Sequence, residues 1–179
     1  MKNFTAAQID LKKPVINEKV GYAKLKREIQ LFLEDVIPEY RNSDTKSSLS
    51  YSEFLSNKLL MVQAIRKGIP FSMFRLIQIV TPFSLNDWAD YLNISGKSLM
   101  RYSQQGKRFK PIHSEKIIEL AEVSNLGLEV FQDSEKFKLW LETPNFALGN
   151  YKPFDLLKNS YGKAMVVSEL TRINYGIFV

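Results

Sequence analysis

The chain has 179 residues, of which 45% are hydrophobic and 12% aromatic, enough to build the core of one ordinary domain or two small ones. It contains no cysteine, which excludes disulfides, thiolate metal sites and thiol nucleophiles and suits a reducing cytoplasm. Residues 1–10 lack the apolar core of a signal peptide, and no stretch approaches the roughly 18 apolar residues of a membrane span. We therefore expect a soluble, cytoplasmic protein with no membrane partner.

The formal net charge is +6 at pH 7, and the excess of Lys and Arg lies in residues 1–113. Residues 114–132, in contrast, carry four Glu against one Lys. A basic chain can bind a polyanion such as nucleic acid, but a solvated basic surface explains the same composition. Charge alone does not select between these two interpretations.

The first predicted helix follows Gly21 and ends at Pro38. Its apolar residues recur at spacings of 4, 3 and 4, which is the pattern of one helical face, and they are Leu25, Ile29, Phe32 and Val36. The polar run 42–48 is too poor in apolar groups to pack and is typical of a linker. We therefore treat residues 1–48 as an N-terminal extension that is cut off from the rest, and we assign it no function.

The compact part is expected to begin near Ser50. The series from Ser50 to Glu53 has the S-x-x-E form in which hydroxyl and carboxylate each accept a backbone N–H at a helix start. One helix is predicted from there to Gly68, with Leu55, Leu59, Val62 and Ile65 on its apolar face. The apolar stretch 70–80 favours a second, buried helix, with a strand as the alternative.

Six further helices are predicted, and no pair of segments with strand-like alternation competes with them. They cover residues 84–91, 95–104, 114–131, 133–142, 153–158 and 160–174. The fold class is therefore all-α. We divide the chain after the extension into residues 49–125, a DNA-binding and dimerisation domain, and residues 126–179, a small helical domain.

The helices at 84–91 and 95–104 are joined by a three-residue turn, which is the spacing of a helix-turn-helix. Ser95 would cap the second helix, and Leu99 would point into the core. Outward cations near the start of a recognition helix meet bases and phosphates, and Lys107, Arg108 and Lys110 follow directly. The predicted DNA-contacting residues are Ser95, Lys97, Ser98, Arg101, Tyr102, Lys107 and Arg108.

A plain helical hairpin with solvated cations explains the same pattern. In that interpretation Tyr102 is a half-buried aromatic and not a contact to the DNA backbone. The pattern from the residues alone leaves both readings of this segment open.

Catalytic chemistry has little support in the sequence. There is no phosphate loop, zinc motif or nucleophile elbow. The single histidine, His113, stands just before a predicted helix and is interpreted as a surface or capping residue, and Asp87 and Asp90 as acidic residues of a helix start. We predict no catalytic residue, no metal site and no cofactor.

Several short motifs follow one another from residue 60 onward. In the first half they are Gly68-Ile69-Pro70 and the series Trp88, Leu92, Ile94-Ser95, Lys97-Ser98-Leu99 and Arg101. In the second half they are Leu120-Ala121, Glu129-Val130-Phe131, Trp140-Leu141, Pro144-Asn145, Ala147-Leu148-Gly149, Pro153, Asp155-Leu156-Leu157, Gly162, Arg172-Ile173 and Tyr175-Gly176. Over residues 60–179 the chain resembles the Xre/MbcA/ParS antitoxins of RES–Xre modules.

This resemblance implies a dimeric antitoxin that represses its own operon and neutralises a RES-domain toxin, which depletes cellular NAD. The antitoxin itself is not an enzyme. It plugs the active-site cleft of the toxin with its C-terminal domain and final residues, here Arg172, Tyr175, Gly176, Ile177, Phe178 and Val179. A stand-alone helix-turn-helix regulator without a toxin partner is the alternative. Two departures are Tyr102, where the family often has a second basic residue, and Gly149-Asn150-Tyr151 in place of a glycine pair.

The C-terminus can also be interpreted without the family. Tyr175 and Gly176 suit a helix C-terminal cap, and three apolar residues with a free carboxylate follow. Such a tail either packs on its own domain or serves as an anchor for a partner, because an untethered terminus frays. The apolar helices at 55–65 and 71–80 similarly either hold a dimer or fill the core of one subunit.

Overall fold

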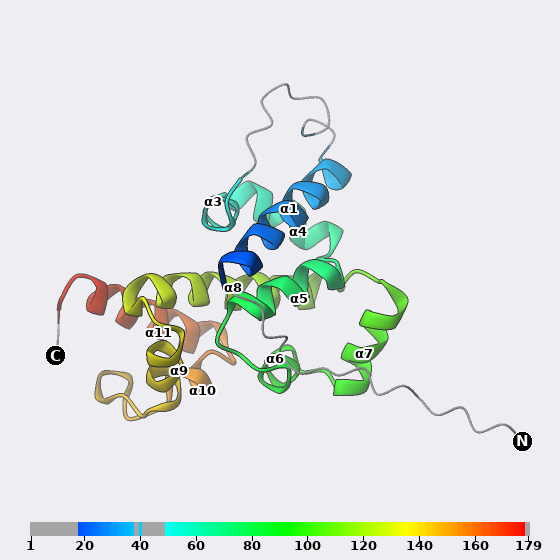
Figure 1. Cartoon of the computed structure of the whole chain (residues 1–179). Helices are drawn as coiled ribbons and strands as arrows, with labels where there is room; N and C mark the ends of the chain where they lie inside the picture. Colours follow the sequence, from blue (N-terminus) through cyan, green and yellow to red (C-terminus); the bar gives the residue numbers. More distant parts are fainter. Residues whose placement is uncertain (1–17, 38–39, 41–48, 178–179) are drawn as a thin grey trace, which may run out of the picture.

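The computed structural model describes residues 18–37, 40 and 49–177 (Figure 1). Within these ranges the chain forms helices and two isolated bridges but no strand, which confirms the all-α fold class. The elements are α1 (Glu18–Val36), α3 (Tyr51–Ser56), α4 (Lys58–Lys67), α5 (Phe71–Val80), α6 (Leu85–Leu92), α7 (Gly96–Gln105), α8 (Pro111–Phe131), α9 (Ser134–Glu142), η1 (Phe146–Leu148), α10 (Pro153–Leu156) and α11 (Ser160–Asn174).

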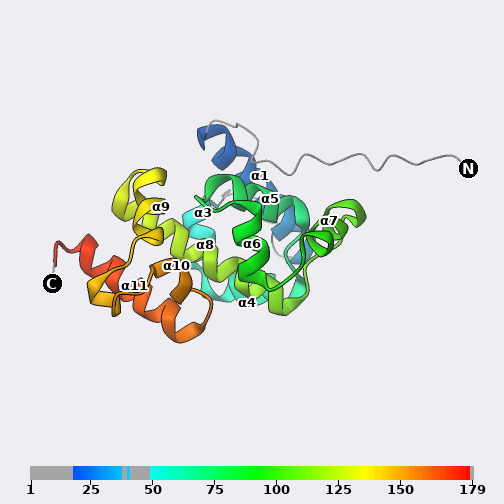
Figure 2. The ribbon, with the colours of Figure 1, turned by 90° about the horizontal axis from the view of Figure 1, so that it is seen from below.

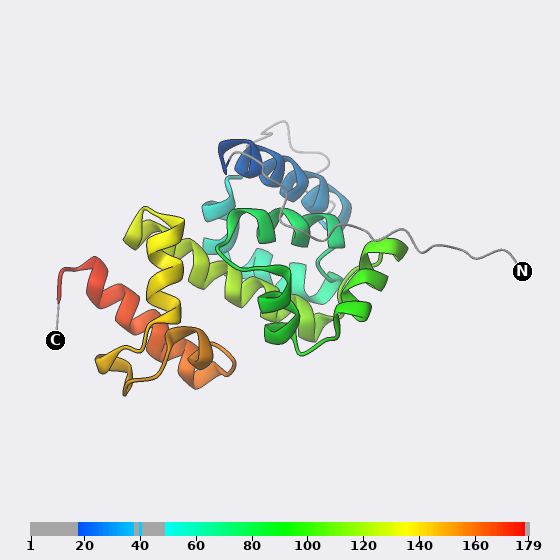
Figure 3. The ribbon, with the colours of Figure 1, turned by 60° about the horizontal axis from the view of Figure 1, so that its bottom comes forward.

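Helix α8 runs through the middle of the molecule and packs against α3, α4, α6, α9 and α11 (Figure 3). Helix α7 lies at one end of the molecule and α11 at the other in all three views (Figures 1 to 3). The boundary predicted after residue 125 falls inside α8, so one continuous helix connects the two predicted domains. No helix in the described ranges is long and apolar enough to cross a membrane.

Helix α1 begins at Glu18, before Gly21, and it packs against α5. The predicted apolar face is the buried one, with Leu25, Ile29 and Phe32 among the core residues. The polar run 42–48 lies outside the described residues. We expected α1 to be set apart from the compact part, but its apolar face needs a partner, and α5 provides one.

The predicted capping box at Ser50 is confirmed. The Ser50 N–H donates to Oε2 of Glu53 (2.7 Å), and the Glu53 N–H donates to Oγ of Ser50 (3.2 Å). The prediction of a single helix from there to Gly68 is wrong, because the helix is interrupted at Asn57, which separates α3 from α4. The Oδ1 atom of Asn57 accepts the Leu60 N–H (3.2 Å) and so caps a new helix.

This break also changes which face of α4 is buried. Leu59 and Val62, predicted to be on the apolar face, are exposed. The break shifts the helical phase, and the residues buried instead are Leu60, Met61 and Ala64. The stretch predicted as a second helix forms α5, and its ring of Phe74 lies 5.3 Å from that of Trp88 and 5.1 Å from that of Phe109. Helix α5 therefore fills the core.

Helix α8 starts at Pro111, three residues before the predicted start at Ser114. Ser114 is buried: its Oγ accepts the N–H of Ile69 (2.9 Å) and donates to the carbonyl of Phe109 (3.3 Å). His113 therefore lies in the first turn of α8 and not before it. Burial lowers its pKa, and the charges of two neighbouring lysines add to this effect.

Helices α9, α10 and α11 and the short helix η1 form the C-terminal part, with α9 and α11 packed against α8 (Figure 2). Asp133 caps α9 by accepting the N–H groups of Glu135 (2.8 Å) and Lys136 (3.0 Å), and these bonds lower its pKa. The predicted helices at 133–142 and 160–174 are thus confirmed, and the one at 153–158 is shorter than predicted.

Candidate functional site

Helices α6 and α7 are joined by residues 93–95, as the sequence predicts. Ser84 and Asp87 form a capping box at the start of α6, with the Ser84 N–H donating to Oδ2 of Asp87 (2.7 Å). Asn93 ends the helix in the left-handed conformation (φ 54°), which Asn tolerates well. The Oγ of Ser95 accepts the Ser98 N–H (3.1 Å) and starts α7. Asp87 is thus a capping residue, in keeping with its predicted place at a helix start.

The outer side of α7 is basic. Leu99 is the buried residue of this helix, and Lys97 and Arg101 are both exposed. Neither cation takes part in the ion pairs found among the described residues. Exposed cations beside a helix start, where backbone N–H groups point outward, are of the kind that attracts anions such as phosphate.

Tyr102, on the same helix, packs against the protein. Its ring is stacked on that of Phe109, with centroids 4.3 Å apart and planes at 22°. The ring of Tyr102 is therefore half-buried, as the helical-hairpin interpretation predicts. A contact between its hydroxyl and DNA stays a prediction.

The basic run after α7 contains two exposed lysines and one arginine that has partners within the protein. Lys107 and Lys110 are exposed. Arg108 instead donates to the carbonyl of Gly68 (3.1 Å) and forms an ion pair with Asp35. Its guanidinium carbon also lies 5.2 Å from the ring centroid of Phe32. The DNA contact predicted for Arg108 would have to compete with these partners.

At the other end of the molecule, α11 presents an exposed stripe to solvent. Tyr161 and Tyr175 are 86% and 75% exposed, and Met165 is exposed between them. The opposite side of the helix is buried through Val166 and Leu170. The stripe, which we call the α11 stripe, consists of the exposed Tyr161, Met165, Ser168 and Tyr175 together with the half-buried Arg172. Of these, the sequence analysis named Arg172 and Tyr175 as toxin contacts, which stays a prediction, and did not name the others.

The loop that carries η1 adds two more exposed aromatic residues. Phe146 and Tyr151 are both exposed, and η1 packs against α11. The N–H of Asn145 donates to the carbonyl of Tyr151 (3.1 Å), which closes the loop. This surface therefore lies beside α11.

The C-terminal cap predicted at Tyr175 and Gly176 is confirmed. Gly176 has φ 70°, its N–H donates to the carbonyl of Ile173 (2.9 Å), and the N–H of Ile177 donates to that of Arg172 (2.9 Å). These two bonds are those of a Schellman motif, which fixes the direction in which the chain leaves the helix. Ile177 is 54% exposed beyond it. Phe178 and Val179 lie outside the described residues.

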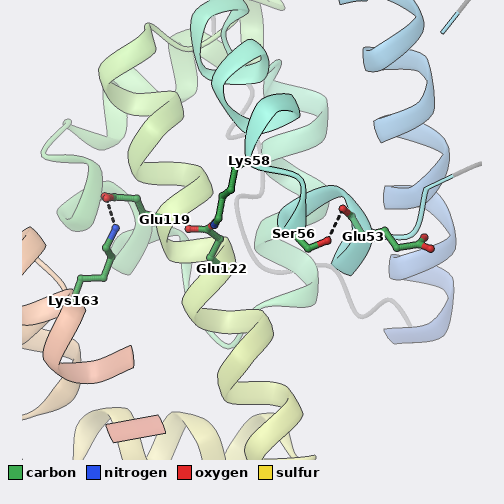
Figure 4. A network of polar contacts seen from close by, with 6 residues as sticks. All are labelled: Glu53, Ser56, Lys58, Glu119, Glu122 and Lys163. Atoms are coloured by element: carbon green, nitrogen blue, oxygen red, sulfur yellow. Dashed lines mark hydrogen bonds and ion pairs between the residues drawn. The ribbon is translucent and has the colours of Figure 1, made fainter. Parts of the chain in front are cut away.

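Two ion pairs on α8 hold its neighbours in place (Figure 4). Nζ of Lys58, on α4, lies 2.5 Å from Oε1 of Glu122, and Lys163, on α11, pairs with Glu119. The acidic segment predicted at 114–132 therefore contacts helices from both parts of the chain. No group of acidic and histidine side chains suited to a metal ion occurs among the described residues.

Comparison with known proteins now adds to this geometry. Residues 126–176 match the family model of the antitoxin Xre/MbcA/ParS C-terminal toxin-binding domain. This part of the chain is similar to antitoxins. The match includes the end of α8, the η1 loop and the α11 stripe.

The chain is also similar to a curated relative, the antitoxin Xre of Yersinia enterocolitica serotype O:8 / biotype 1B (strain NCTC 13174 / 8081). The two are 26% identical over 124 residues, which are 69% of this chain and 84% of the relative. Both comparisons support the predicted antitoxin family. An antitoxin is not an enzyme, in agreement with the prediction from the sequence.

Proposed function

We propose that this chain is the antitoxin of a toxin–antitoxin pair that neutralises a RES-domain toxin and represses its own operon. The observation that carries the proposal is the exposed α11 stripe, inside the segment that matches a toxin-binding domain. The α11 stripe and the tail from Gly176 face the toxin, and α7 faces operator DNA.

The chemistry of the α11 stripe suits a protein partner. Two tyrosines, a methionine and Arg172 lie on it, and Tyr and Arg are enriched among the residues that dominate binding energy at interfaces. Exposed aromatic and methionine side chains that lie along one face of a helix are typical of an interaction surface. Arg172 is held by an ion pair with Glu169 (3.3 Å), so its side chain is oriented before binding.

The tail can block a cleft that binds NAD. Ile177 begins the tail with an exposed apolar side chain, which we call the apolar lead. Full burial of such a side chain in the cleft contributes roughly 1.5–3 kcal/mol to the free energy of binding. The Schellman motif directs this lead away from α11.

The neutralisation test compares two equally exposed residues. Ile177→Asp places a charge on the apolar lead, and we expect it to abolish the rescue of cells that express the toxin. Leu31→Asp on α1 is the matched control, because Leu31 is 52% exposed and Ile177 54%. The readouts are growth and NAD content at equal antitoxin abundance. Full rescue by Ile177→Asp, or by a chain that lacks residues 176–179, would refute the role of the tail.

The DNA test changes two cations on α7. Lys97→Ala with Arg101→Ala should abolish binding to the promoter of its own operon in a gel-shift titration, at roughly 1–3 kcal/mol for each lost base contact. Toxin rescue should remain. Lys24→Ala with Arg27→Ala is the control, since these exposed cations of α1 give the same change of charge. Equal loss in both double variants would mean that only net charge matters.

The partner assignment has its own test. A pull-down from the native cytoplasm should recover a RES-domain protein in stoichiometric amount. Recovery of the chain alone at every expression level would instead fit a stand-alone regulator.

A homodimer is part of this proposal, because one helix-turn-helix covers too few base pairs and dimers read two half-sites. Since α5 is buried in the core, the exposed side of α4 with Leu59 and Val62 is the remaining candidate from the sequence analysis. Light scattering should give twice the 20.7 kDa mass of the chain. Leu59→Asp should lower this mass and weaken promoter binding, and an unchanged dimer would exclude this side of α4.

A further inference from the structure

The C-terminal end of α1 contacts Arg108, which follows α7, the proposed recognition helix. Asp35 pairs with Arg108, and Phe32, one turn earlier on α1, lies under the same guanidinium at 5.2 Å. The remaining partner of Arg108 is the carbonyl of Gly68, at 3.1 Å. Arg108 thus joins α1 to the end of α4. This contact comes from the N-terminal segment, for which the sequence suggested no function.

The loop held in this way supports α7. Arg108 pairs with Pro70 in an isolated antiparallel bridge, and the N–H of Phe109 donates to the carbonyl of Ile69 (2.8 Å). Phe109 is buried, and its ring carries the stacked ring of Tyr102, which belongs to α7. Apart from this stack, α7 is anchored by its buried Leu99.

We infer that α1 positions the DNA-reading helix, with Asp35 and Phe32 holding Arg108 so that the loop 106–109 fixes α7. Arg108 is then a positioning residue and not a contact to phosphate. The inference rests on the proposed DNA binding by α7. It gives the N-terminal segment a role in reading DNA that does not require α1 to touch the duplex.

Two electrostatic consequences separate this role from a phosphate contact. An arginine whose charge is already balanced by Asp35 releases no counterion from DNA, so it adds nothing to the salt dependence of binding. A free phosphate-binding arginine would add about one to the slope. Moreover, removing the negative charge of Asp35 should strengthen binding if Arg108 touches phosphate, but should weaken it if Arg108 holds the loop.

The main experiment uses Asp35→Asn in the full chain, with a labelled duplex that covers the promoter of its own operon. We expect the affinity to fall about two- to fivefold, the range for loss of one largely exposed ion pair, with an unchanged salt slope. Glu34→Gln is the control for charge, because it removes one negative charge from the last turn of α1, keeps a side-chain oxygen that can accept the Gln30 amide, and leaves Arg108 paired. It should bind as tightly as the wild type.

A second pair of variants measures the salt slope. Arg108→Gln should weaken binding without changing the slope, whereas Lys107→Gln, next to it but exposed, should lower the slope by about one. Tighter or unchanged binding by Asp35→Asn would overturn the inference. A slope that falls equally in both glutamine variants would overturn it as well.

A measurement without DNA distinguishes the two proposals. Amide exchange at Phe109, whose N–H is bonded to Ile69, should accelerate in Asp35→Asn but not in Glu34→Gln. If the wild type fails to bind promoter DNA even at low salt, the proposed function fails, and the inference fails with it. If the wild type binds but exchange at Phe109 is unchanged in Asp35→Asn, only the inference fails.

Discussion

Gly127, on α8, lies directly against the ring of Phe137, on α9. A Cβ atom at this position would lie 2.1 Å from Cζ and 2.2 Å from Cε2 of Phe137. Phe137 is fully buried and stacks on Phe131 (5.8 Å) and Trp140 (6.2 Å), so its ring has little room to move. Alanine is favoured over glycine inside a helix by about 1 kcal/mol, but forced repacking costs about 1–3 kcal/mol. Because three ring atoms would clash, we expect the repacking cost at the upper end of its range, about 2–3 kcal/mol. Gly127→Ala should therefore lower the free energy of unfolding by about 1–2 kcal/mol.

Urea denaturation followed by circular dichroism measures this change as a lower midpoint at constant slope. Gly96→Ala is the control, since a Cβ there meets nothing within 4 Å, and we expect its stability to be unchanged or slightly increased. Phe137→Leu removes part of the ring, so Gly127→Ala should cost less in that background. A Gly127→Ala variant as stable as the wild type would show that α9 can move, and the reasoning from close approach would be refuted.

Three further outcomes follow from the structure. Gly162→Ala should lower the melting temperature in calorimetry, because its Cβ would lie 2.1 Å from the carbonyl oxygen of Leu156, and backbone cannot rotate away. His113→Asn should reduce the loss of stability on acidification, because the pKa of His113 is lowered in the folded state. The stability that its neutral form provides is complete above the pKa of the unfolded state, near 6.5, and is lost as the pH falls through the pKa of the folded state. Melting curves from pH 7 to 5 can follow this loss. Lys163→Met should increase amide exchange along α11, because Glu119 then loses its partner on that helix.

Helix starts could be predicted where the cap is local. Ser50, Ser84 and Ser95 each accept an N–H three residues ahead, so the information lies within four residues of sequence. Ser114 has the same appearance but a different role, because it bonds the N–H of Ile69, 45 residues earlier. The break at Asn57 is a cap that the sequence analysis did not predict. The apolar pattern continues through it and hides the fact that the Asn side chain caps a new helix.

Which side of a helix faces solvent depends on what packs against it. In α11 the stripe through Val166 and Leu170 and the stripe through Tyr161 and Met165 both have helical spacing. Contacts with α8, α10 and η1 cover the first and leave the second exposed. The sequence therefore predicted contacts for the tail and Arg172 but did not single out Tyr161 and Met165, which lie on the exposed face of α11.

The basic run after α7 shows that the surroundings of a charged side chain also depend on distant partners. Lys107, Arg108 and Lys110 are equivalent in the sequence, since each is a cation next to a predicted recognition helix. The carboxylate that pairs with Arg108 belongs to Asp35, 73 residues earlier, and a pair at that separation leaves no local pattern. A count of cations therefore overstates the phosphate contacts available. Of this run, the structure leaves the two exposed lysines free to release counterions, so the run should add about two, and not three, to the salt slope of promoter binding.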